Sequence, residues 1–181
     1  SVITTYGGTS TCGLSGDNGP VSSAQISVPR SMYVDSLSNL YFTDSANYRV
    51  RKVSSATNII TNIMGSNWGA FAENVTATAA KFRGLSGIWV DSNGHVFVTD
   101  SSLNRIVRWN SKSNFVNNFA GTGTGGALGD GGLATLAQLK SPQGLWGDSN
   151  LKLFIVDSGN YKIRVLNLVT NIITTFAGVG V

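Results

Sequence analysis

Short apolar segments of five or six residues recur along the whole chain and are separated by polar turn residues. Val, Ile, Thr, Phe and Tyr are frequent inside the segments, and Asp, Ser, Asn and Gly are frequent between them. Branched and aromatic residues favour extended strands, whereas the second group favours tight turns. The pattern therefore predicts antiparallel strands joined by hairpins. The first four predicted strands are Ser31–Asp35, Leu40–Asp44, Arg49–Val53 and Ile59–Met64.

The segment Val34–Asp44 returns without a gap as Val90–Asp100 and as Gly147–Asp157. The copies start at residues 34, 90 and 147, so the spacing is 56 and then 57 residues. A period of this length indicates a repeated supersecondary unit. The other predicted strands are Gly87–Asp91, Val96–Asp100, Arg105–Trp109 and Phe115–Ala120 in the second unit, and Gly144–Asp148, Leu153–Asp157, Lys162–Leu166 and Ile172–Ala177 in the third.

Four-stranded meanders at this spacing are typical of β-propeller blades. The sequence therefore predicts an all-β fold, a β-propeller of four-stranded antiparallel blades with three blades in the chain. We expect a single domain over residues 1–181, with blade 1 at 9–65, blade 2 at 66–121 and blade 3 at 122–181. Residues 1–8 are predicted to form an extra outer strand, because Val2–Gly8 is nearly a copy of Ile172–Gly178.

Three stretches of the chain resemble the NHL-repeat family in two motifs. They are a proline-glycine start at Ser141–Gly144 and an aspartate followed by asparagine and a basic residue at Asp44–Arg49 and Asp157–Lys162. The second unit departs from the pattern, because Arg83–Gly87 lacks the proline and Leu103 replaces the asparagine. The resemblance covers essentially the whole chain. It implies a propeller, commonly six-bladed, that binds proteins or RNA and is only occasionally an enzyme.

An open arc of three blades would expose two apolar blade faces, which monomers rarely tolerate. Two chains related by a two-fold axis would supply six blades. We therefore predict a homodimer, in which each chain is half of a six-bladed ring formed by self-association. The alternative is that the sequence is half of a longer chain. The aromatic position shared by Tyr33, Trp89 and Trp146 is predicted to pack between blades.

The nine carboxylates occupy three repeat-equivalent positions, so none is singular in the way that a catalytic acid or base usually is. We predict structural roles for all of them. Asp35 and its counterparts are expected to cap turn amides. Ion pairs that close the turns between the second and third strands are predicted between Asp44 and Arg49, Asp100 and Arg105, and Asp157 and Lys162.

Candidates for catalysis or metal binding are few. Cys12 is the only cysteine and His95 the only histidine, so an intrachain disulfide, a catalytic triad and a histidine-rich zinc site are excluded. The glycine-rich loops at Asp17 and Asp130 contain oxygen ligands for a cation, but turn geometry explains the same residues. We predict no catalytic residue, no metal and no cofactor. The alternative is a metal-dependent propeller enzyme of the lactonase or lyase type.

The ligand is expected at the end of the blades where the long connections and the turns between second and third strands emerge. We call this end the long-loop face, and variable loops make it the default binding face. Trp68 and Phe71 have no counterparts in the other two loops, so they are the predicted ligand contacts. A protein or a glycan is the expected ligand. RNA is the alternative, although no cluster of basic and aromatic residues supports it.

Charge and composition add little to this picture. The net charge of +4 favours acidic partners. No stretch approaches 18 consecutive apolar residues, so no membrane span is predicted. The glycosylation sequon at Asn74–Thr76 and the many Ser, Thr and Asn residues favour an extracellular location.

Overall fold

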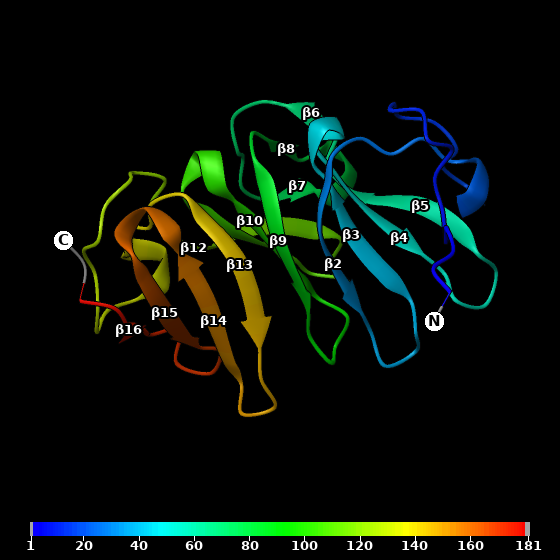
Figure 1. The fold of residues 1–181 in the computed structure, drawn as a ribbon. Helices are drawn as coiled ribbons and strands as arrows, with labels where there is room; N and C mark the ends of the chain where they lie inside the picture. Colours follow the sequence, from blue (N-terminus) through cyan, green and yellow to red (C-terminus); the bar gives the residue numbers. More distant parts are fainter. Residues whose placement is uncertain (1, 180–181) are drawn as a thin grey trace.

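The computed structural model describes residues 2–179, which contain three antiparallel sheets side by side and no α-helix (Figure 1). Each sheet is a meander of four strands that follow one another in the chain. Sheet 1 contains β2 (Pro29–Val34), β3 (Leu40–Asp44), β4 (Arg49–Val53) and β5 (Ile59–Met64). Sheet 2 contains β9 (Leu85–Val90), β10 (Val96–Asp100), β11 (Arg105–Trp109) and β12 (Phe115–Ala120). Sheet 3 contains β13 (Pro142–Gly147), β14 (Lys152–Asp157), β15 (Lys162–Asn167) and β16 (Ile173–Ala177). Strands at all twelve predicted positions are confirmed.

The connection that leads into each sheet also covers the outer edge of that sheet. β1 (Gly19–Pro20) pairs with β5, and β7 (Val75–Thr76) pairs with β12. In sheet 3 a single bridge joins Leu133 to Ile172. The start of the outermost strand of each meander is therefore not an open edge, which reduces the risk of strand-to-strand aggregation there.

The three sheets share their pairing irregularities. The register shifts between Pro29 and Met32 in the first strand pair of sheet 1, and shifts at the equivalent places occur in sheets 2 and 3. The third and fourth strands shift between Val50 and Arg51 in sheet 1 and at the equivalent places in the other two sheets. Bulges at fixed positions indicate that the repeated sequence specifies the backbone geometry of the unit.

Apolar cores lie between neighbouring sheets rather than inside one sheet. Alternate residues of each strand face opposite ways, so each sheet has one face toward the preceding sheet and one toward the following sheet. Tyr41, Val50 and Met64 of sheet 1 pack on Ile88 and Val98 of sheet 2. The equivalent residues of sheet 2, which are Phe97, Ile106 and Ala120, pack in the same way on Leu145 and Ile155 of sheet 3.

The repeated aromatic position packs between sheets where a following sheet exists. Trp89 is 6% exposed and lies against Gly147, where a Cβ atom would overlap the indole ring. At the previous junction Tyr33 packs in the core that contains Val90, the counterpart of Gly147. The larger ring thus meets glycine and the smaller ring meets valine, which keeps the volume at the two junctions similar.

The segment Val2–Tyr6, predicted as an extra outer strand, pairs with no strand among the described residues. Its side chains are exposed; Ile3 is 97% accessible to solvent. The residues that follow it are fixed, since the N–H of Gly8 donates to the carbonyl of Val21 at 3.0 Å. The N–H of Gly65, which follows β5, donates to Ala77 in the same way at 2.9 Å. The segment therefore leads into sheet 1 as β5 leads into sheet 2.

Candidate functional site

The turn between the second and third strands contains a buried aspartate in every sheet. These residues are Asp44, Asp100 and Asp157. In sheet 1 the carboxylate accepts hydrogen bonds from the N–H of Ser27 at 2.7 Å and from Nδ2 of Asn47 at 2.8 Å. Equivalent bonds occur in sheet 3. The carboxylate therefore fastens the long connecting loop to this turn.

The cation that pairs with Asp44 is Arg51 and not the predicted Arg49. Asp44 lies opposite Arg49 in the strand pair, as expected, but the Nη1 atom of Arg51 is 3.1 Å from Oδ2 of Asp44. The Nε atom of Arg51 is 2.9 Å from Oδ1 of Asp17, which belongs to the long loop. Arg49 instead donates to the carbonyl of Gly65 at 2.9 Å. Arg49 and Arg51 point to the same face of the sheet, and the loop carboxylate decides which of them is buried.

Sheet 3 repeats this correction. Arg164, whose side chain is fully buried, contacts Asp157 at 3.3 Å and Asp130 at 2.7 Å. Lys162, the predicted partner of Asp157, forms no ion pair within the described part of the chain. Both buried arginines bridge two carboxylates, one in the turn and one in the loop. Each arginine thus connects the long loop to the sheet through ion pairs. Its loss would leave a buried carboxylate without a compensating charge.

Asp100 of sheet 2 has no cation, so its predicted pair with Arg105 is also wrong. Val107 occupies the position of the buried arginine in this sheet. The carboxylate accepts hydrogen bonds from the N–H groups of Arg83 and Gly84, both at 2.9 Å, and from Leu103 at 3.2 Å. Burial raises the pKa of Asp100 above its ordinary value of 3.8, although these N–H groups oppose the shift. Sheet 2 therefore buries an unpaired acid.

Removing Asp100 is expected to change how stability depends on pH. A carboxyl whose pKa is raised on folding favours the folded state below pH 3.8, and this contribution is lost as the pH rises through the folded pKa. The free energy of unfolding of the wild type minus that of Asp100→Ala should therefore fall as the pH rises above 4. Urea unfolding between about pH 3 and pH 7 measures the difference. A difference that grew with pH would contradict the raised pKa.

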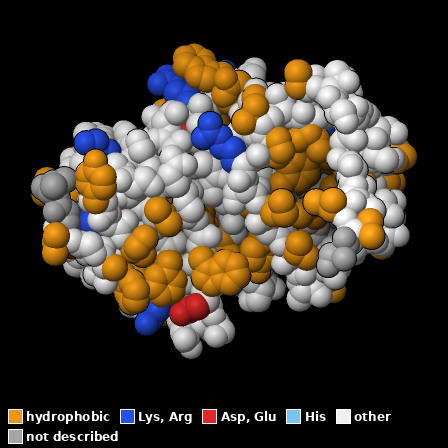
Figure 2. Space-filling view, in the orientation of Figure 1, with side chains coloured by type: hydrophobic (Ala, Val, Ile, Leu, Met, Phe, Trp, Pro, Cys, Tyr) orange, Lys and Arg blue, Asp and Glu red, His pale blue; other side chains and the backbone are white. Residues whose placement is uncertain are grey.

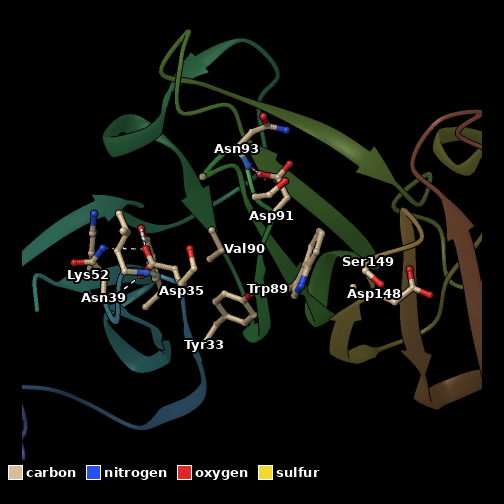
Figure 3. Close-up of a pocket in the computed structure, with 16 residues that line it drawn as sticks. Tyr33, Asp35, Asn39, Lys52, Trp89, Val90, Asp91, Asn93, Asp148 and Ser149 are labelled. Carbon is tan, nitrogen blue, oxygen red and sulfur yellow. Dashed lines mark hydrogen bonds between the residues drawn. The ribbon is translucent and has the colours of Figure 1, made fainter.

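A cleft of about 530 Å³ opens at the other end of the sheets, between the turns that join first and second strands (Figure 3). Tyr33 and Trp89 lie at its centre. The polar residues around it are Asp35, Asn39, Lys52, Asp91, Asn93, Asp148 and Ser149. The turn pattern predicts capping by Asp35 and its counterparts but does not predict this cleft. Only the packing of three sheets brings the turns together.

The carboxylates of this cleft have the predicted capping role. Oδ1 of Asp35 accepts hydrogen bonds from the N–H groups of Leu37 and Asn39, and Oδ2 accepts from the hydroxyl of Tyr41 at 3.1 Å. Burial and the Asp35 carboxylate raise the pKa of Tyr41 to about 12. Asp91 and Asp148 cap their turns with one oxygen each. These acids are therefore occupied by their own hairpins.

Trp68 and Phe71, the predicted ligand contacts, both lie on the second long loop. Trp68 belongs to β6 (Asn67–Trp68), which pairs in parallel with β8 (Lys81–Phe82). The Trp68 side chain is 57% exposed. The Arg83 guanidinium lies over its ring, with Cζ 4.7 Å from the centroid. Phe71 is partly buried against the sheet core, and Arg105 lies 5.4 Å from its ring. Trp68 is thus the open ring, and Phe71 is mainly structural.

Residues typical of catalysis are not brought together. The Nδ1 atom of His95 accepts a hydrogen bond at 3.2 Å from the N–H of Ser111, in a neighbouring turn of sheet 2. Cys12 is exposed and unbridged. Residues 2–179 contain no group of three His, Cys, Asp or Glu side chains that could hold a metal ion. Within the same residues no helix is long and apolar enough to cross a membrane.

The outward faces of the two end sheets are apolar and exposed. On sheet 3, Trp146 is 64% and Phe176 is 65% exposed, whereas the equivalent Trp89 is 6% exposed. On sheet 1, Met32 is 72% and Val34 is 55% exposed, whereas their counterparts in sheet 2 are buried. Figure 2 shows the apolar side chains of both end sheets on one side of the molecule. These residue types are the ones that close the internal junctions.

Several solved structures share this arrangement of sheets. Virginiamycin B lyase from Staphylococcus aureus is 19% identical, with a TM-score of 0.57 over 87% of this chain and 43% of that one. An auxiliary nutrient binding protein from Bacteroides ovatus is 17% identical, with a TM-score of 0.61 over 86% and 37%. A chain of the nidogen/laminin complex is 18% identical, with a TM-score of 0.60 over 87% and 49%. The fold is that of a β-propeller.

These similarities extend to the fold alone, since identities below 20% say nothing about activity. The chain spans less than half the length of these three structures. No protein-family model and no curated protein sequence matches the chain.

Proposed function

We propose that the chain is a non-catalytic propeller scaffold of the NHL-repeat type. Its three sheets act as blades, two chains associate into a six-bladed ring, and the long-loop face binds a protein or a glycan. The observation on which this rests is the pair of exposed end faces, which present the residues used at the two internal junctions.

The two end faces are complementary, because they correspond to the two opposite sides of an internal junction between sheets. Sheet 3 ends with the face that packs forward onto a following sheet, and sheet 1 begins with the face that receives a preceding sheet. Sheet 3 of one chain can therefore pack on sheet 1 of a second chain, and a two-fold axis repeats the contact. Burial of large apolar side chains such as Trp146 and Phe176 supplies the driving force.

The aromatic position at this new junction differs from both internal ones. Trp146 would meet Val34 of the second chain, whereas Trp89 meets Gly147. Because valine occupies the space that the Trp89 ring needs, Trp146 must adopt another rotamer there. A variant that restores an internal pairing, either tyrosine with valine or tryptophan with glycine, should fit the junction without that adjustment.

The segment Val2–Tyr6 belongs to the same junction. It enters sheet 1 as an outer strand of a preceding blade would, and it resembles β16 in sequence. The outer edge of β16 is already covered, since the N–H of Gly131 donates to the carbonyl of Ile173 at 2.8 Å. The segment therefore reaches strand β15 of the second chain only by taking the place of β16.

The binding role rests on the long-loop face. Trp68 is exposed on a short strand pair that sheets 1 and 3 lack, so it interrupts the repeat where a contact residue is expected. Loops held by rigid sheets are the usual location of recognition residues in such folds.

The native mass in solution tests the assembly. We expect size-exclusion chromatography with light scattering to report about twice the 19.0 kDa chain mass at micromolar concentration. A stable monomer would contradict the proposal, and so would a series of larger species, because an open chain of contacts would replace the closed ring.

A further inference from the structure

The end of the molecule with the long loops carries most of the excess positive charge. It contains nine Lys and Arg residues against six carboxylates, so its net charge is +3 of the total of +4. The cations are Arg30, Arg49, Arg51, Lys81, Arg83, Arg105, Lys140, Lys162 and Arg164, and the carboxylates are Asp17, Asp44, Glu73, Asp100, Asp130 and Asp157. Figure 2 shows Lys and Arg side chains along this upper part of the molecule.

Half of the carboxylates of this end are buried. Asp44, Asp100 and Asp157 are fully buried. Asp17 and Asp130 are 33% and 38% exposed, and each shares a buried arginine with a turn aspartate. Glu73 accepts a hydrogen bond from the N–H of Asn118 at the outer edge of sheet 2. The remaining seven cations form no ion pair within residues 2–179, so the exposed charge of the long-loop face is positive.

Three of these cations have no ion pair because the turn aspartates have other partners. Arg49, Arg105 and Lys162 were predicted to be neutralised by the turn aspartates, but the structure gives those aspartates other partners. Each sheet therefore offers one cation at the start of its third strand, and the packing of the sheets repeats it at regular intervals. A regular series of positive groups matches a polymer with regularly spaced anions better than it matches a single small anion.

The second long loop adds a stacked pair of an aromatic ring and a guanidinium to this series of cations. The Arg83 guanidinium stacks on the exposed Trp68 ring, and Lys81 lies beside Gly69 on the neighbouring strand. A ring with a guanidinium over one face offers a flat apolar surface to a sugar and a charged donor to the acidic group of that sugar. In this part of the molecule Trp68 is the exposed ring that carries a guanidinium, and Tyr161, in the turn before Lys162, is also exposed, at 73%. Single-stranded nucleic acid would instead require a series of stacking rings, about one for each base.

We infer that the long-loop face binds an acidic polysaccharide, with the Trp68–Arg83 pair as the main contact and the cations of the third strands along the polymer. The inference rests on the binding role proposed for this face and specifies its ligand. Because the contacts are ionic and exposed, binding weakens as salt screens them.

Binding to polygalacturonate tests the inference, with neutral dextran and single-stranded RNA as comparisons. We expect affinity for polygalacturonate to fall roughly tenfold or more between about 50 mM and about 200 mM salt, as it does when several ion pairs form with a polyanion. Dextran should not bind. Tighter binding of the RNA than of polygalacturonate, or binding that ignores salt, would overturn the inference.

Variants locate the contact. Trp68→Ala and Arg83→Ser should each weaken binding of polygalacturonate about tenfold. Lys112→Ser and Lys152→Ser remove the same charge at the opposite end and should leave affinity unchanged. A loss for Lys112→Ser and Lys152→Ser as large as that for Arg83→Ser would mean that net charge alone attracts the polymer, and the inference would fail. The native mass is measured on the same samples. A dimer that does not bind refutes only the ligand, whereas a monomer that binds refutes only the assembly.

Discussion

Replacing Arg51 by methionine is expected to lower the free energy of unfolding by about 3–5 kcal/mol, because a buried carboxylate loses its cation. The Arg51 side chain is fully buried, and Asp44 beside it is also inaccessible to solvent. Methionine fills much of the same space without charge, so the loss is mainly electrostatic. Urea unfolding at one fixed protein concentration measures it, since association would otherwise alter the apparent stability.

Arg49→Met is the matched control, because Arg49 lies opposite Asp44 but donates to a loop carbonyl. It should cost no more than about 1.5 kcal/mol, the usual contribution of one hydrogen bond. If Arg49→Met destabilised the protein as much as Arg51→Met, the assignment of the buried ion pair to Arg51 would be incorrect.

Trp146→Asp is expected to weaken the dimer about thirtyfold or more, because buried aromatic anchors at interfaces contribute on the order of 2 kcal/mol or more. The indole is 64% exposed in the single chain, so the fold of the chain itself should survive the change. Light scattering over a dilution series gives the dissociation midpoint. An unchanged midpoint would exclude this face from the junction.

Three further variants separate the packing of the junction from its hydrophobicity. Trp146→Tyr recreates the pairing of Tyr33 with valine and should preserve the dimer. Val34→Gly recreates the pairing of Trp89 with Gly147 and should tighten it. Leu136→Asp replaces a residue that is equally exposed but lies on the long loop before sheet 3, so it should have no effect on the mass.

Local pattern was sufficient to predict the strands and their order. β3, β4 and β5 have the predicted bounds, and β2 starts two residues earlier than expected, at Pro29. The prediction succeeds because strand and turn preferences act over a few residues and the threefold repeat averages out local errors. The strand register that places Asp44 opposite Arg49 follows from turn length alone and is also confirmed, although the two side chains form no ion pair.

The ion pairs could not be predicted in the same way, although a signal exists. Two cations, Arg49 and Arg51, point to the face that carries Asp44, and only the loop carboxylate of Asp17 decides between them. The sequence contains a correlation that points to Arg51, because the loop acid is aspartate in the two units with the buried arginine. In the unit where Val107 replaces this arginine, the loop acid is Glu73.

By itself, the sequence determined the repeated unit, its four strands, its turns and the two positions, Trp68 and Phe71, that interrupt the repeat. The tertiary structure decided which charges are buried, which end faces stay exposed and where the turns meet in a cleft. Strand and turn formation depends on neighbours in the chain, whereas burial depends on segments that approach from 30 or more residues away, such as Asp17 on Arg51. The cations of the long-loop face lack ion pairs because the turn and loop carboxylates bind the buried arginines and backbone N–H groups instead.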